Sequence, residues 1–200
     1  MASPLLIAAL CMGKRHTGAF LFCFAGMGMC LLSAYLNTFL AALYGADAFA
    51  ATVEIAPVVE EGMKLLPLLF YLLVFEPQAR QIGIAAVITA LSFATFENIC
   101  YLIQNGAAHF SFIFFRGIGT GAMHVICGAI VGGGLAYVWR RTWLKIAGTC
   151  GLLGAAITFH AIYNLLIAYG GTAQYIAYLL PVGILAAGKL IARYLKAAEG

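Results

Sequence analysis

The chain has 200 residues, of which 64% are hydrophobic and only 9% are charged. A soluble domain carries about 25% charged residues, so this composition excludes an ordinary water-soluble domain. The net charge of +4 is spread over short connections with no basic face and no stacking platform, which excludes nucleic acid as a partner.

Long apolar stretches predict an all-α fold, a polytopic membrane bundle that residues 1–200 form as one integral-membrane domain. In chain order the predicted spans are 17–44, 49–75, 81–104, 110–139, 143–169 and 173–196. An earlier apolar piece, residues 4–12, is shorter than the roughly 20 residues that a helix needs to cross the hydrocarbon core. It is interpreted as a surface helix, a dipping half-helix or a short seventh span.

Basic residues gather in the connections on one side of this six-span topology. They are Lys14, Arg15, Arg80, Arg140, Arg141, Lys145, Arg193 and Lys196. The positive-inside rule therefore predicts a multi-pass cell-membrane protein whose positively charged loops and C-terminus lie in the cytoplasm.

Ionisable and amide side chains lie deep inside four of the spans. In chain order they are Glu60, Glu61, Lys64, Glu97, Asn98, His124, His160 and Asn164. Each ionised group at the bilayer centre costs about 2.5–3.5 kcal/mol, so three glutamates and a lysine would cost on the order of 10 kcal/mol if unpaired. A rise of about 1.5 Å per residue puts Glu60, Glu97, His124 and His160 about 12–18 Å from the outer boundary, which predicts a shared polar layer.

Spacing within the spans adds a second pattern. Residues four apart share a helix face, and this spacing relates Glu60 to Lys64, Phe93 to Glu97, His124 to Gly128, and His160 to Asn164. Pro57 and Pro67 bracket the first of these pairs, and each removes a backbone donor from its helix. The pattern predicts polar faces directed at one another.

Four short motifs carry a family resemblance. Read in order they are EEGMK (60–64), FATFEN (93–98), HVICG (124–128) and HAIYN (160–164). This series resembles the PrsW family of intramembrane proteases and, more distantly, the CAAX prenyl endopeptidases. The resemblance implies one membrane-embedded peptidase domain and a membrane-anchored protein or small peptide as substrate.

A carboxylate beside an imidazole can take a proton from water, which is what peptide hydrolysis requires. The expected catalytic residues are Glu60, Glu61, Glu97, His124, His160 and Asn164, with Lys64, Asn98, Phe93 and Gly128 in support. Either Glu60 or Glu61 is the base, and the other orients a histidine or the lysine. Asn164 and a histidine are the candidates for stabilising the oxyanion.

A metal-dependent version of the same chemistry remains open at this point. Two histidines and two carboxylates at one depth are an acceptable zinc site with one position left for water, and the candidates are Glu61, Glu97, His124 and His160. A glutamate mechanism without a metal is the alternative that the CAAX resemblance favours.

Two other classes of function are compatible with buried polar residues. Intramembrane carboxylates and histidines also form the sites of proton- or cation-coupled transporters and channels, although those usually show an internal repeat that this chain lacks. The same scaffold could also be a non-catalytic membrane subunit. Glu54 and Arg116 lie near the predicted outer surface and are interpreted as interfacial residues.

Overall fold

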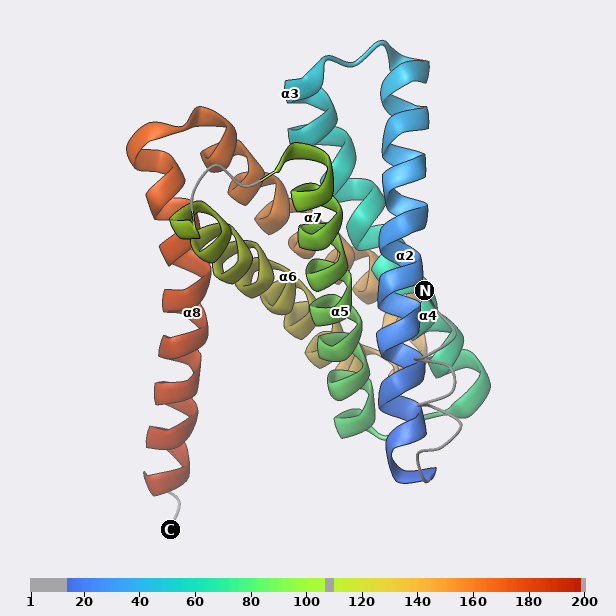
Figure 1. Ribbon diagram of the computed structural model, residues 1–200. Helices are drawn as coiled ribbons and strands as arrows, with labels where there is room; N and C mark the ends of the chain where they lie inside the picture. Colours follow the sequence, from blue (N-terminus) through green and yellow to red (C-terminus); the bar gives the residue numbers. More distant parts are fainter. Residues whose placement is uncertain (1–13, 107–109, 199–200) are drawn as a thin grey trace.

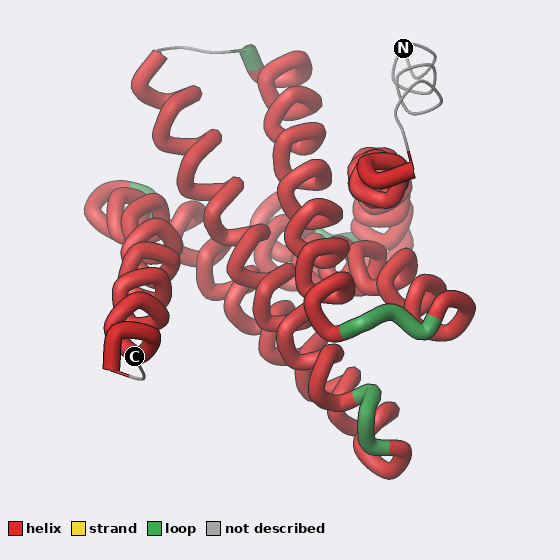
Figure 2. The backbone as a smooth tube through the Cα atoms, turned by 90° about the horizontal axis from the view of Figure 1, so that it is seen from below, coloured by secondary structure: helices red, strands yellow, loops and turns green. Residues whose placement is uncertain are grey.

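The computed structural model describes residues 14–106 and 110–198, which fold into helices joined by short connections (Figures 1 and 2). The long helices are α2 (Lys14–Tyr44), α4 (Ala56–Phe75), α5 (Ala79–Asn105), α6 (Phe110–Val138), α7 (Lys145–Tyr169) and α8 (Gly171–Ala198). The predicted all-α bundle is confirmed. The predicted N-terminal apolar piece, residues 4–12, lies outside the described residues.

The number of spans differs by one from the predicted six. Five helices of the described chain are long and apolar enough to cross a membrane: Gly18–Tyr44, Ala79–Gln104, Phe112–Val138, Thr142–Tyr169 and Gly171–Ile191. The remaining long helix, α4, does not meet this test because Glu60, Glu61 and Lys64 lie within its 20 residues. These charges are the same ones that mark the site.

The helical segment that ends in α4 does not begin with α-helical geometry. Asp47 caps its first turn, α3 (Ala48–Ala50), by accepting a hydrogen bond from the Ala50 N–H. This turn leads into a π-helix, η1 (Ala51–Ile55), which continues into α4. The N–H of Ala56 donates to Ala51, five residues back, instead of to Thr52. Pro57 follows and has no N–H, so the carbonyl of Thr52 lacks the donor that either helical register would supply.

Helices α5 and α6 form the centre of the bundle, with α2 packed on α5, and α7 and α8 on α6 (Figure 1). Small residues allow the α5–α6 approach. A Cβ added to Gly128 would lie 2.7 Å from the Cβ of Ala90, and one added to Gly132 would lie 2.5 Å from the Cβ of Ala86. The close contact brings the polar faces of the two helices together.

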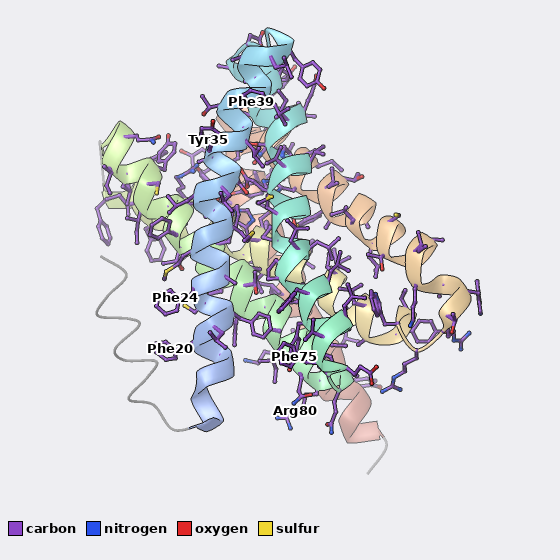
Figure 3. The ribbon with its side chains drawn as sticks, turned by 90° about the vertical axis from the view of Figure 1, so that its right-hand side faces the viewer. Phe20, Phe24, Tyr35, Phe39, Phe75 and Arg80 are labelled. Carbon is purple, nitrogen blue, oxygen red and sulfur yellow. The ribbon has the colours of Figure 1, made fainter. Side chains whose placement is uncertain are left out.

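Apolar side chains cover the outside of the bundle. Figure 3 shows Phe20, Phe24, Tyr35 and Phe39 spaced along α2, and Tyr35 is 71% exposed. The buried set, in contrast, includes charged and imidazole side chains. This distribution is the reverse of that in a soluble domain, and it matches hydrocarbon as the surrounding solvent.

Candidate active site

The centre of the polar layer is an ion pair on α4. Lys64 Nζ lies 2.5 Å from Glu61 Oε1 and 2.9 Å from Nδ1 of His124, which belongs to α6. The side chains of Lys64 and Glu61 are 7% and 2% exposed. Each partner therefore offsets a charge that would be costly in isolation at this depth.

The hydrogen-bond partners define which nitrogen of each histidine carries a proton. Because the Lys64 ammonium can only donate, His124 accepts at Nδ1 and donates from Nε2 to Glu97 Oε2, 2.7 Å away. His160 Nδ1 lies 2.8 Å from the Glu61 carboxylate and donates to it. The Nε2 lone pair of His160 is then free, 3.8 Å from Glu60 Oε2.

A cavity of about 550 Å³ adjoins this cluster, and α2, η1 and helices α4 to α7 all contribute to its wall. Glu60, Glu97 and His160 line the cavity, and Asn37 of α2 donates a 3.3 Å hydrogen bond to Glu60. Glu61, Lys64 and His124 are not among the lining residues. They lie behind the wall and hold the residues that face the cavity.

The residues expected to support the site have separate places. The Phe93 ring lies 5.3 Å from that of His124 and 5.1 Å from Lys64 Nζ, so it closes one side of the cluster. Gly128 contacts α5 rather than the cavity. The Oδ1 of Asn98 is buried and has no hydrogen-bond partner within the described part of the chain.

Asn164 lines the cavity and also ties two helices together. Its Nδ2 donates to the carbonyl of Thr52 at 2.9 Å. This is the carbonyl that the π-turn and Pro57 leave without a backbone donor. Asn164 therefore supplies the hydrogen-bond donor that the Thr52 carbonyl of η1 lacks. The motif spacing does not reveal this contact.

Arg116, interpreted from the sequence only as an interfacial residue, is part of the site. Its Nη2 lies 3.2 Å from Glu97 Oε1, its guanidinium lies 3.6 Å from the centroid of the Tyr101 ring, and it lines the cavity. A signal was present in the sequence, because Arg116 precedes His124 by eight residues, a spacing that recurs on one helix face. Asn37, which binds Glu60, was also missed.

The charges of the cluster do not cancel. Three carboxylates, those of Glu60, Glu61 and Glu97, face the cations Lys64 and Arg116. With neutral histidines and ionised carboxylates, one negative charge remains. A proton or a cation would offset it.

One group of side chains has the geometry to hold a metal ion. Glu60, His124 and His160 each offer one ligand atom, and these atoms lie within 4.8 Å of one another. The grouping differs from the expected set, which contained Glu61 and Glu97. Glu61 is instead engaged by Lys64 and by His160 Nδ1.

Carboxylates and imidazoles around a cavity in a polytopic membrane bundle are the groups that a membrane-embedded hydrolase requires. The family model described as PrsW family intramembrane metalloprotease matches residues 14–187. The chain therefore belongs to the PrsW family of intramembrane proteases, as the resemblance of the four motifs implied. Neither a curated protein nor a solved structure matches it.

Proposed function

We propose that the protein hydrolyses a peptide bond of a membrane-anchored protein or peptide in the 550 Å³ cavity, using a water molecule activated by Glu60 and His160. The observation that supports this most strongly is the meeting of carboxylates and imidazoles from α4, α5, α6 and α7 beside one cavity. Family membership supports the same class of reaction.

In this proposal Glu60 is the general base. Its carboxylate faces the cavity and is bound by the Asn37 amide, whereas the Glu61 carboxylate is held by Lys64 and His160. Glu60 takes a proton from water as the oxygen attacks the scissile carbonyl carbon, and it then delivers that proton to the leaving amine. Glu61 orients His160 so that the free Nε2 lone pair points toward Glu60.

Asn164 is suited to stabilise the negative charge that develops on the carbonyl oxygen. It uses one N–H on Thr52 and retains a second N–H at the cavity wall. The Nε2–H of His124 is donated to Glu97 behind the cavity wall and is not available to the substrate. A fixed donor such as the Asn164 amide acts where the charge forms and needs no rearrangement during the reaction.

The donor set also fits zinc, since two imidazoles and a carboxylate leave a fourth position for water. Glu60 and His160, whose Nε2 lone pair is free, would hold the ion, and His124 would join them on giving up the contact of one ring nitrogen with Lys64 or Glu97. The Glu61 carboxylate on His160 Nδ1 is the partner that metal-binding histidines commonly have. When bound, zinc would polarise the carbonyl and make water more acidic. A metal would also offset the excess negative charge of the cluster.

The orientation of the substrate follows from the predicted topology. The cavity is lined by Gln104 and Ile167, near the ends of α5 and α7 opposite to the basic connections. If the basic connections are cytoplasmic, the cavity opens in the extracytoplasmic half of the membrane. We therefore propose cleavage of the substrate near its extracytoplasmic side.

The test uses the purified protein in lipid vesicles with a single-span substrate that carries a fluorophore and quencher around its extracytoplasmic juxtamembrane segment. We expect Glu60→Gln to lower the cleavage rate by about 10²–10⁴-fold, the usual contribution of a general base. Glu54→Gln is the matched control, since Glu54 is an exposed residue of the adjoining η1. Its rate is expected to be unchanged.

The same vesicles distinguish a transporter from a protease. A pH-sensitive dye inside them reports proton flux while cleavage is followed outside. If Glu60→Gln abolished proton flux and left cleavage intact, the result would contradict the proposed function.

A further inference from the structure

A second cavity, of about 430 Å³, lies at the end of the bundle that carries the basic connections. The last turns of α4 and α6 and the first turns of α5 and α7 form its wall, with the short loop 77–78 at its edge. It shares no lining residue with the proposed active site. Membrane helices leave the hydrocarbon core at such ends, so the cavity lies at the level of lipid head groups.

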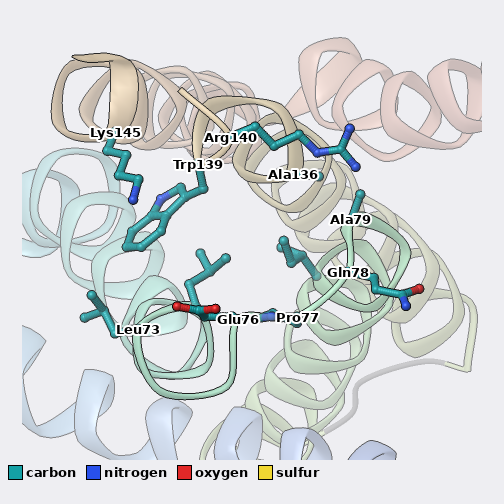
Figure 4. Close-up of a pocket in the computed structure, with 11 residues that line it drawn as sticks. Leu73, Glu76, Pro77, Gln78, Ala79, Ala136, Trp139, Arg140 and Lys145 are labelled. Carbon is teal, nitrogen blue, oxygen red and sulfur yellow. The ribbon is translucent and has the colours of Figure 1, made fainter. Parts of the chain in front are cut away.

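Charges of both signs line this cavity without being paired to each other. Glu76, Arg140 and Lys145 all contribute to the wall, and none of them takes part in an ion pair of the described residues. Figure 4 shows the ring of Trp139 between Lys145 and Glu76, with Arg140 on the side of Ala79. Two cations and one anion are complementary to a ligand that carries both charges.

The carboxylate is presented by an unusual backbone. Glu76 ends α4 with φ 44°, in the left-handed region, where glycine is the usual residue. A residue with a Cβ is more strained in this conformation than glycine would be. The charged side chain at the cavity edge is what glutamate adds at this position, and we therefore expect its role there.

The aromatic wall is held rigid. The Trp139 indole N–H donates to Thr149 Oγ1 at 3.2 Å, and that hydroxyl donates to the carbonyl of Lys145 at 2.6 Å. Lys145 Nζ lies 5.2 Å from the centroid of the indole ring. These contacts orient the indole ring and tie it to the first turn of α7, which carries Lys145.

The remaining wall is apolar. Leu72, Leu73 and Ile82 lie on the side of the cavity toward the body of the helices, and Leu73 is 69% exposed. A polar rim above apolar side chains suits a molecule with a charged head and a hydrocarbon tail.

We infer that this cavity binds a phospholipid whose head group carries a primary ammonium, such as phosphatidylethanolamine. The phosphate contacts Lys145 and Arg140, the ammonium contacts Glu76, and the acyl chains follow Leu73 into the bilayer. Basic pockets between membrane helices are known binding sites for lipid head groups. The carboxylate here adds a preference for a zwitterion over an anion.

The test measures retained lipid by native mass spectrometry after extraction from vesicles with equal amounts of phosphatidylethanolamine, phosphatidylcholine and phosphatidylglycerol of the same acyl chains. We expect wild-type protein to retain phosphatidylethanolamine over each of the others by a factor of about 2–5, the range for an exposed ion pair. Glu76→Gln should abolish that preference, and Glu76→Asp should keep it. Lys145→Gln should lower retention of all three lipids.

Arg141→Gln is the matched control, because Arg141 adjoins Arg140 and does not line the cavity. It should retain lipid like the wild type. Equal retention of the three lipids by the wild type would overturn the inference, as would a preference that Glu76→Gln leaves intact. Binding of free phosphoethanolamine as tightly as the lipid would overturn the assignment to a lipid, because the acyl chains along Leu73 would then contribute nothing.

Discussion

Glu60 and Glu61 are adjacent in the sequence and have different surroundings in the structure. Neighbours on an α-helix point about 100° apart. Glu61 turns inward to Lys64 and His160 and is 2% exposed, whereas Glu60 turns toward the cavity and is 12% exposed. The charge of Glu61 has partners, whereas Glu60 keeps an oxygen available for water. This difference is the basis for assigning the base to Glu60.

Removing one member of the buried Lys64–Glu61 pair should be more harmful than removing both. Lys64→Met leaves the Glu61 carboxylate without its cation, and breaking a buried pair costs about 3–5 kcal/mol. The double variant Glu61→Gln/Lys64→Met should regain a substantial part of this loss. Thermal unfolding in detergent, followed by circular dichroism, measures both. A double variant less stable than Lys64→Met would contradict the pairing.

Zinc content provides a second test at the residue scale. If Glu60, His124 and His160 hold the ion, the purified wild-type chain should bind zinc, and His160→Asn should lose it. Glu61→Gln should weaken zinc affinity by about 10–100-fold, because it removes the partner of His160 Nδ1. Elemental analysis after dialysis against zinc gives the content. Wild-type activity that persists after zinc is stripped would instead support a glutamate mechanism without metal.

At the scale of elements, the π-turn and α7 depend on each other. The turn leaves the Thr52 carbonyl without a backbone donor, and Asn164 supplies one from the neighbouring helix. His160 lies one turn before Asn164 on α7, and Glu60 lies one to two turns after the π-turn. The contact therefore sets how the helix of the proposed base meets the helix of its histidine.

A double-mutant cycle tests this dependence. Asn164→Ala should cost about 0.5–1.5 kcal/mol of unfolding free energy, the net value of one hydrogen bond. In a Pro57→Ala background the same change should cost less, because residue 57 then has an N–H for the neighbouring carbonyls. Unfolding free energies of the four chains give the coupling energy. Equal costs in both backgrounds would show that Pro57 and Asn164 act independently.

At the scale of the whole molecule, one end of the bundle carries the basic connections and the other end carries the proposed active-site cavity. The loop 76–78 and the connection 139–144 lie at the basic end, and Arg80 is labelled near that end in Figure 3. The connection after Tyr44 lies at the opposite end, beyond α2 (Figure 1). The family and the apolar helices place the chain in a membrane.

The positive-inside rule predicts which end faces the cytoplasm. In intact cells, a membrane-impermeant thiol reagent should label Tyr44→Cys and not Gln78→Cys, with the unmodified protein as the background for native cysteines. After the cells are opened, both should be labelled. The reverse pattern would invert the predicted topology and move the proposed cleavage to the cytoplasmic side.

The sequence by itself determined the fold class and the family. Hydrocarbon imposes long apolar helices, and these are visible without any tertiary information. The four motifs also pointed to the family because each is local to one helix. The span count was the exception, since charges that mark the site also lower the apolar character of α4.

Only the tertiary structure decided how the polar residues pair. The contacts of Glu61 with His160, of Lys64 with His124, of Arg116 with Glu97 and of Asn164 with Thr52 all join different helices. Such contacts depend on how far each helix is rotated about its axis and where two helices cross. Small residues of α6 such as Gly128, which pack against α5, fix the rotation and the crossing point of these helices. No motif within a single helix encodes either quantity.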